Sequence, residues 1–150
     1  KNKKEDLFND TSSDLDIGFR VLKLDSSNME DVYYNPNDLN QNDLLSLISN
    51  IKQGRTDEDL LFQVMLDLGV LLSSKIDTQM INGKKLFNVN RGYLMACFDE
   101  NVDEEVITEV AKMKPIYFVM RDSSLANDSV FANFDQIFDR YSPDTIRKVL

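Results

Sequence analysis

The residues best suited to chemistry in this chain are three carboxylates that follow strand-like runs. Asp99 and Glu100 come after the apolar run YLMACF, and Asp122 comes after IYFVMR. If these two strands are parallel, all three side chains lie at the carboxyl edge of the sheet, where open α/β sheets place their ligands. Carboxylate oxygens are preferred ligands of Mg²⁺, so one interpretation is a magnesium site for phosphate chemistry. The alternative, which we favour, is that Asp99 starts a turn and that Asp122 or Asp128 caps the next helix.

Serine and cysteine chemistry lacks its usual partners here. Ser123 and Ser124 follow Asp122, but the sequence contains no histidine to activate a serine and no lysine at a recognisable spacing. Cys97 is the single cysteine, so neither an intramolecular disulfide nor a zinc site of cysteine and histidine ligands is expected. There is no glycine-rich phosphate loop. We therefore predict no catalytic residue, no cofactor-binding residue and no metal ligand apart from the three candidate carboxylates.

The charge of the chain argues against independent binding to DNA. Seventeen Lys and Arg residues oppose 26 Asp and Glu residues, which gives a net charge of -9. Such a surface repels a phosphate backbone on average. An auxiliary DNA contact within a larger protein is a third interpretation, carried by Arg20, Lys23 or Arg121. No apolar run is long enough to cross a membrane, so we expect a cytoplasmic protein with no membrane partner.

Length and composition are those of one globular domain. The chain has 150 residues, of which 42% are hydrophobic and 29% charged, enough apolar material for one core. Residues 1–16 are polar and are interpreted as a linker or as the remnant of a preceding region. Residues 17–150 are predicted to form a single α/β domain. We expect a mixed sheet of about four or five strands with a βαβ unit and flanking helices.

Turn residues and apolar spacing predict the elements of that sheet. Residues 19–25 alternate in the manner of a strand with one buried face. Residues 78–99 are expected to form a strand pair, with turn chemistry supplied by Asn82-Gly83 and Arg91-Gly92. Between residues 93 and 122, two strand-like runs flank a helical pattern, which predicts a βαβ unit with parallel strands. Only a short turn is expected after the last helix. Aromatic residues at steps of three and four predict that helix, and we expect their stripe to lie in the core. They are Phe131, Phe134, Phe138 and Tyr141.

The most apolar helix of the chain begins after Thr56. Thr56 and Asp59 have the spacing of a capping box, and from residue 60 to residue 72 the helix is expected to be apolar on nearly all sides. We expect Gly69 to let another backbone come close. A helix of this kind is buried on more than one side, either in the core or against a partner chain. The interface candidates, with core packing as the alternative for each, are Phe62, Met65, Leu66 and Leu72.

Four long blocks of the chain stand out as a set: FRVLKLDSSNMEDVYYNP, RTDEDLLFQVMLDLGVLLSSKI, GYLMACFDENVDEEVITEVAK and YFVMRDSSLANDSVFANFDQIF. In this order they resemble the carboxyl-terminal region of the Mod subunits of type III restriction-modification systems. The resemblance covers residues 17–150. Mod subunits are site-specific DNA methyltransferases that modify adenine at N6. The family's DPPY-type catalytic motif and its S-adenosylmethionine loop are absent from these residues, and the family carries them upstream.

The resemblance implies a role in assembly. Mod subunits dimerise and also assemble with the Res restriction subunit, and the carboxyl-terminal region is similar to an assembly module of that complex. The implied partners are a second Mod subunit, the Res subunit, or both, with DNA bound through the full-length protein. S-adenosylmethionine is implied as a cofactor of the parent protein and not of these residues. We therefore expect a non-catalytic assembly domain.

Overall fold

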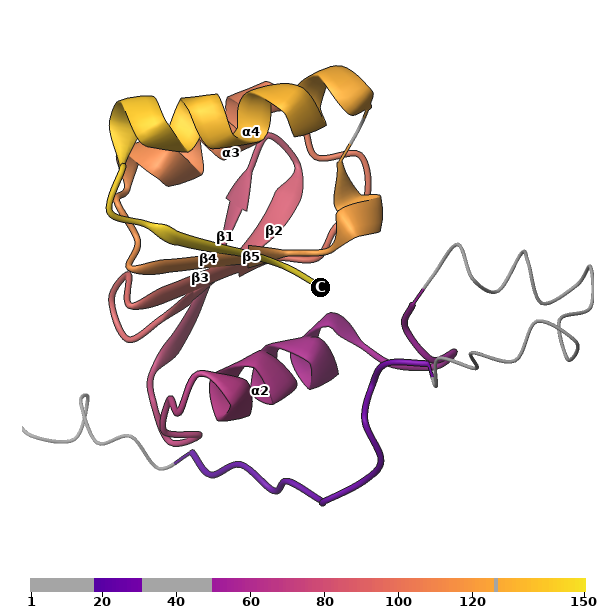
Figure 1. Ribbon diagram of the computed structural model, residues 1–150. Helices are drawn as coiled ribbons and strands as arrows, with labels where there is room; N and C mark the ends of the chain where they lie inside the picture. The colour runs from indigo at the N-terminus through magenta and orange to yellow at the C-terminus, as the bar shows by residue number, and fades with distance from the viewer. Residues whose placement is uncertain (1–17, 31–49, 126) are drawn as a thin grey trace, which may run out of the picture.

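A mixed five-stranded sheet runs through the middle of the protein (Figure 1). The computed structural model describes residues 18–30, 50–125 and 127–150. The first three strands are antiparallel and the last three are parallel, in the order of the chain. The expected α/β fold with a mixed sheet is confirmed, whereas the linker expected at residues 1–16 lies outside the described residues. The strands are β1 (Ile76–Ile81), β2 (Lys84–Val89), β3 (Leu94–Cys97), β4 (Tyr117–Met120) and β5 (Ile146–Val149).

The antiparallel half of the sheet follows from its turns. Asn82 and Gly83, between β1 and β2, have φ angles of 47° and 78°. Both therefore adopt the left-handed backbone that a type I′ hairpin turn requires, which asparagine and glycine tolerate best. Asn90, Arg91 and Gly92 make the turn into β3 in the same region, with φ angles of 51°, 56° and 93°. The predicted strand pair is confirmed.

The predicted βαβ unit is also confirmed. Helix α3 (Glu104–Lys112) joins β3 to β4, and the two strands are parallel. The Asp103 side chain accepts a hydrogen bond from the main-chain N–H of Val106 at 3.0 Å and caps the helix. Lys112 in the last turn places a positive charge at the negative end of the helix dipole.

Strand β5 is the element that the sequence does not predict. Only a short turn is expected after helix α4 (Asp128–Tyr141), but β5 follows it and pairs parallel with β4, which makes a second βαβ unit. Its sequence is IRKV, and three of its four residues are exposed, so the strand lacks the alternation of a half-buried strand. Its pairing comes from its neighbour. The N–H of Ile146 donates to the carbonyl of Ile116 at 2.8 Å, and the N–H of Leu150 donates to that of Met120 at 2.9 Å.

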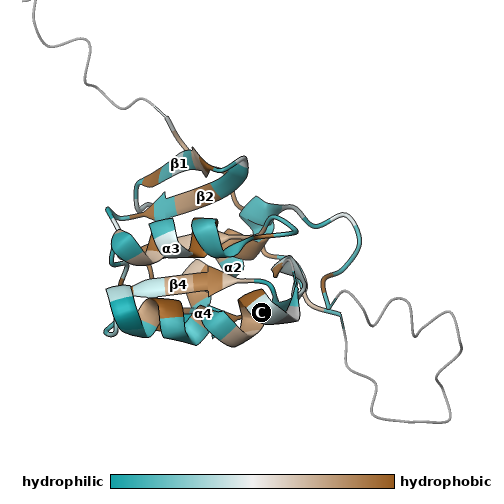
Figure 2. Ribbon diagram, turned by 90° about the horizontal axis from the view of Figure 1, so that it is seen from above, coloured by the Kyte–Doolittle hydropathy of each residue, from teal (hydrophilic) through white to brown (hydrophobic). Residues whose placement is uncertain are grey.

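Helices cover both faces of the sheet, with α3 and α4 on one side and α2 (Asp57–Asp67) on the other (Figure 1). Phe118 of β4 stacks on Phe138 of α4 with ring centroids 5.3 Å apart, and Phe134 meets Phe138 edge-on at the same distance. Figure 2 shows polar and apolar residues interleaved along α4. Phe131 belongs to the predicted core stripe but is 60% exposed, so that part of the prediction is wrong. No helix in the described residues is long and apolar enough to cross a membrane.

Both ends of α2 are set by local sequence. The Thr56 hydroxyl accepts from the N–H of Asp59 at 3.2 Å, and the Asp59 carboxylate accepts from the N–H of Thr56 at 2.8 Å, which is the predicted capping box. At the other end Gly69 has a φ of 68°, and the N–H of Val70 donates to the carbonyl of Met65 at 2.7 Å. This is a Schellman ending. The helix therefore ends at Asp67, and the predicted continuation to residue 72 is wrong, because the left-handed Gly69 stops it. No atom stands within 4 Å of a Cβ added to Gly69, so the close backbone approach predicted there is wrong.

Residues 18–30, which we call the strap, run along the outer side of α2, away from the sheet (Figure 1). The strand predicted at residues 19–25 is wrong: within the described chain these residues belong to no ladder. Alternating side chains make a strand only when a neighbouring edge offers hydrogen-bond partners, and α2 offers none. The strap regains backbone pairing at its end, where an isolated antiparallel bridge joins Met29 to Ile51.

Candidate interaction groove

Helix α2 has an apolar stripe that faces the sheet and a mixed polar and apolar stripe on its outer side. Its inner residues are buried in the core between α2 and the sheet, and they are Leu60, Leu61, Val64 and Met65. Its outer stripe carries Asp59, Phe62, Gln63 and Leu66 at the spacing of one helix face. The sequence-based expectation that this helix is covered on more than one side thus has a physical basis, because the strap lies over the outer stripe.

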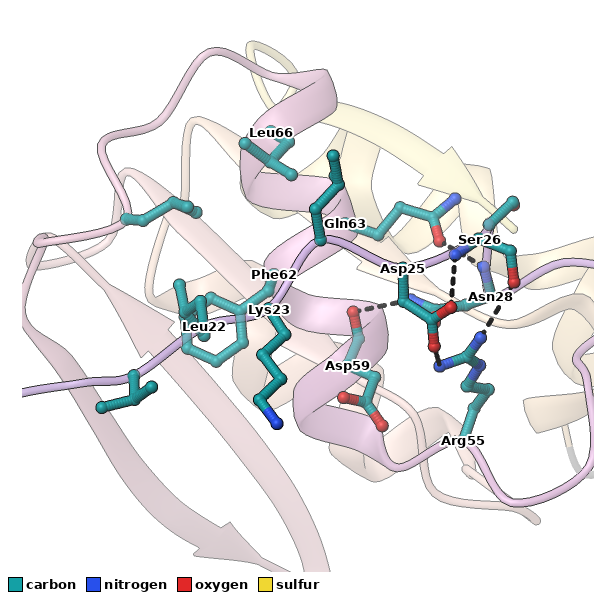
Figure 3. A pocket seen from close by; sticks show the side chains of 14 residues that line it. Leu22, Lys23, Asp25, Ser26, Asn28, Arg55, Asp59, Phe62, Gln63 and Leu66 are labelled. Atoms are coloured by element: carbon teal, nitrogen blue, oxygen red, sulfur yellow. Dashed lines mark hydrogen bonds and ion pairs between the residues drawn. The ribbon is translucent and has the colours of Figure 1, made fainter.

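A groove of about 670 Å³ separates the strap from the outer stripe of α2 (Figure 3). Apolar side chains of both elements form its floor and walls, and polar side chains gather towards the amino end of α2. The apolar lining residues are Val21, Leu22, Leu24, Phe62, Leu66 and Leu72. The polar lining residues are Lys23, Asp25, Ser26, Ser27, Asn28, Arg55, Asp59 and Gln63.

The first contact that holds the strap joins a strap side chain to main-chain carbonyls beyond the carboxyl end of α2. The Arg20 guanidinium donates to the carbonyl oxygens of Leu72 and Ser74, each at 2.9 Å. A charged donor makes these bonds stronger than neutral ones. Arg20, one of the candidate DNA contacts, is therefore engaged within the chain.

The second contact that holds the strap is a charged pair at the amino end of α2. Arg55 Nη1 lies 2.9 Å from Asp25 Oδ2, and its Nη2 donates to the Ser26 hydroxyl at 3.2 Å. The hydrogen bond from the Ser26 N–H, and after it the Arg55 guanidinium, hold the pKa of Asp25 below its ordinary value. The Asp25 carboxylate is largely exposed, so water screens this pair and its contribution to stability is small.

Asn28 supplies the third contact and is the most buried residue of the strap. Its Nδ2 donates to the carbonyl of Asp59 at 2.8 Å, and its N–H donates to Oε1 of Gln63 at 3.0 Å. Its own carbonyl accepts from the N–H of Lys52 at 2.8 Å. Asn28 thus ties the strap to α2 and to the segment that precedes the helix.

The four interface candidates have different surroundings. Met65 is fully buried between α2 and the sheet and presents no surface to a partner. Phe62 and Leu72 are half-buried and line the groove. Leu66 also lines the groove and is 59% exposed. Three of the four residues therefore lie at one surface.

The three candidate magnesium ligands do not converge. Oδ2 of Asp99 accepts a hydrogen bond from the main-chain N–H of Lys85 at 2.6 Å, and the Glu100 carbonyl accepts from Lys84 Nζ at 2.8 Å. Asp122 is exposed in a short 3₁₀ helix, η2 (Asp122–Ser124). Among the described residues, no three acidic or metal-binding side chains are grouped as a metal site requires. All three residues follow the strand ends as the sequence predicts, but the Asp99 side chain binds the main chain of β2 instead of joining the other two in a metal site.

The capping role predicted for these acids belongs to other residues. Asp103 caps α3, and Oδ1 of Asn127 accepts from the N–H of Val130 at 3.1 Å to cap α4. Asp122 makes no cap, because η2 separates the strand from α4 and its capping position is occupied by Arg121 without a side-chain hydrogen bond. The sequence thus predicts the right chemistry at the junction but the wrong residue. Ser124 beside it is buried, and its hydroxyl has no hydrogen-bond partner in the described part of the chain.

The other two candidate DNA contacts, Lys23 and Arg121, have different surroundings. Lys23 is exposed on the strap, and Arg121 lies after β4 with its Nε buried and without a hydrogen-bond partner among the described residues.

Burial raises the pKa of the Cys97 thiol to about 11, so this cysteine is not activated for nucleophilic chemistry. The sequence does not reveal the residues that hold the strap, Asp25, Asn28 and Arg55. Each contacts a residue some 30 positions away along the chain, and such a contact leaves no local pattern.

Comparison with known proteins finds no match to a protein-family model, a curated protein or a solved structure. The groove geometry and the resemblance of the four sequence blocks are therefore the two grounds for a functional proposal.

Proposed function

We propose that this chain is a non-catalytic assembly domain that binds a protein partner through the groove and the exposed outer stripe of α2. Following the sequence resemblance, we assign it to the carboxyl-terminal region of a type III Mod subunit, with a second Mod subunit or the Res subunit as the partner. S-adenosylmethionine, DNA and the methyl-transfer site would then belong to upstream parts of a cytoplasmic parent protein.

The distribution of exposed apolar side chains supports the proposal. Six large hydrophobic residues are exposed on the strap, on α2 or just after α2, and they are Phe19, Val21, Leu22, Leu24, Leu66 and Leu71. Phe19 is 86% exposed and Leu24 fully so. Other exposed hydrophobic residues of the described chain are spread over β1, β5, α4 and the turn after α3. Clustering on one face is typical of a surface that another protein covers.

The mass of the chain in solution tests self-assembly. We expect light scattering across a concentration series to give a dimer, and Leu66→Glu to shift it towards monomer, because a carboxylate placed in an apolar contact must be desolvated. Phe131→Glu is the matched control, since Phe131 is equally exposed but lies on α4, across the sheet from α2.

A monomeric chain directs the test to the Res subunit. We then expect the chain to co-purify with co-expressed Res, and Leu66→Glu but not Phe131→Glu to remove that association. A chain that neither dimerises nor binds Res, or whose association responds equally to both substitutions, contradicts the proposal.

A further inference from the structure

We propose that the groove receives an extended segment of a protein partner, which adds as a strand alongside the strap and carries apolar residues at alternate positions with flanking cationic residues. This inference rests on the proposed function and specifies the kind of partner that the groove fits. It has three supports: the course of the groove along the strap, the unpaired backbone of the strap and the negative charge of the protein.

The groove follows the course of the strap. Its lining includes every strap residue from 21 to 28, together with Asp59, Phe62, Gln63 and Leu66 of α2. A chain segment lying in the groove would therefore run beside the strap, as an added strand does.

The strap offers main-chain hydrogen bonds to such a segment. Within the described chain, the N–H and carbonyl groups of residues 21–24 have no hydrogen-bond partner. These residues belong to no helix, strand or turn and run along α2 (Figure 1). Their ends are anchored by Arg20 on one side and by Asp25 and Asn28 on the other. An anchored and unpaired backbone is the template that strand addition uses, with main-chain bonds giving affinity and side-chain pockets giving specificity.

The charge of α2 defines the polar positions of the segment. The helix carries Asp57, Glu58, Asp59 and Asp67 and no basic residue. Asp59 is engaged in the capping box and Glu58 lies 3.6 Å from Lys85 Nζ, whereas Asp67 is exposed at the carboxyl end of the helix. Lysine or arginine beside an apolar segment would meet Asp67, and the net charge of -9 would attract the same partner from a distance.

Selection from a phage-displayed library of linear twelve-residue peptides on the 150-residue chain tests the inference. We expect enriched peptides to alternate apolar residues and to carry Lys or Arg near their ends. The best peptide is then synthesised in two N-methylated forms, one methylated at odd positions and one at even positions. Because only one edge of an added strand bonds to the strap, we expect one form to lose at least about tenfold in affinity and the other to retain it.

Two variants of the protein locate the binding. Leu66→Glu in the helix and Leu22→Asp in the strap should each weaken the peptide by about tenfold or more, and Phe131→Glu should leave its affinity unchanged. Leu22 and Leu66 are both exposed, and two substitutions on different elements guard against a single misfolded variant. Enrichment of peptides with helical spacing, equal loss from both N-methylated forms, or no enrichment at all would overturn the inference.

These outcomes are separable from those of the proposed function. If the chain dimerises or binds Res in a manner sensitive to Leu66→Glu while no extended peptide binds, only the inferred binding mode fails. If extended peptides bind the groove while dimerisation and Res binding are both absent, the assignment to a Mod subunit fails and the groove remains a peptide-binding surface.

Discussion

Replacing Asn28 should release the strap from α2 by an amount that can be worked out from its contacts. Asn28→Ala removes the bond from Nδ2 to the Asp59 carbonyl, made at 2.8 Å, and leaves the main-chain bonds to Gln63 and Lys52 in place. One such hydrogen bond contributes about 0.5–1.5 kcal/mol. For a domain of this size, each 1 kcal/mol corresponds to roughly 2–4 °C in Tm. We therefore expect a decrease in Tm of about 1–6 °C.

Asn28→Asp should cost more than Asn28→Ala, because it sets a carboxylate oxygen against the Asp59 carbonyl, close to the donor position that Nδ2 now fills. A buried polar group left without a partner costs about 1–3 kcal/mol, and a charged one costs more. Lys23→Ala is the matched control in the strap, since the Lys23 side chain is exposed and makes no hydrogen bond within the described residues, so a change there is expected within ~0.5 kcal/mol.

The assay combines urea denaturation with hydrogen–deuterium exchange of residues 18–30. We expect exchange in the strap to rise in the order wild type, Asn28→Ala, Asn28→Asp, with residues of β3 and β4 unchanged. Equal exchange in all three proteins would show that Asn28 does not pin the strap, and the groove would then lose one of its walls as a fixed feature.

Three further outcomes follow from the packing and the charges. Phe138→Ala should destabilise the fold by about 3–5 kcal/mol in urea denaturation, because it empties a fully buried ring site, whereas Phe131→Ala should change stability by less than ~0.5 kcal/mol. Cys97, with its pKa at about 11, should react with a thiol reagent at pH 8 only after unfolding, so labelling in the native state that is as fast as in denaturant would contradict its burial. The folded-state pKa of Asp25 is lowered, so the stability it supplies is present above its unfolded pKa near ~4 and is lost as pH falls through the folded value. Strap exchange should rise on acidification in the wild type, and Asp25→Asn should remove that dependence.

The elements that could be predicted from sequence are those with local signals. The Asn82-Gly83 turn, the acidic start of α3 and the capping box at Thr56 each act within a few residues, and the structure has all three. Strand β5 could not be predicted from its own residues, since an exposed edge strand with two charged residues among its four is defined by its hydrogen bonds to β4.

The strap is the opposite case, because a strand is predicted there and the structure has none. Its alternating residues 19–25 have the pattern of a strand, but pattern alone does not provide a partner edge. The apolar residues on more than one side of α2 indicated that a second element packs on this helix. That this element is the strap depends on two contacts, Asp25 with Arg55 and Asn28 with Asp59, between residues some 30 positions apart. The carboxylates at the sheet edge were located correctly as neighbours of strand ends, while their side-chain directions depend on packing that spacing does not encode.

The most direct test of the assembly surface is a hydrogen–deuterium exchange footprint of the chain with and without its partner, as a concentration-dependent dimer or bound to Res. We predict slower exchange on assembly in residues 18–30 and in α2, with no change in α4. Protection confined to α4 or β5, with the strap and α2 exchanging as before, would contradict the assignment of the groove as the surface through which this protein assembles.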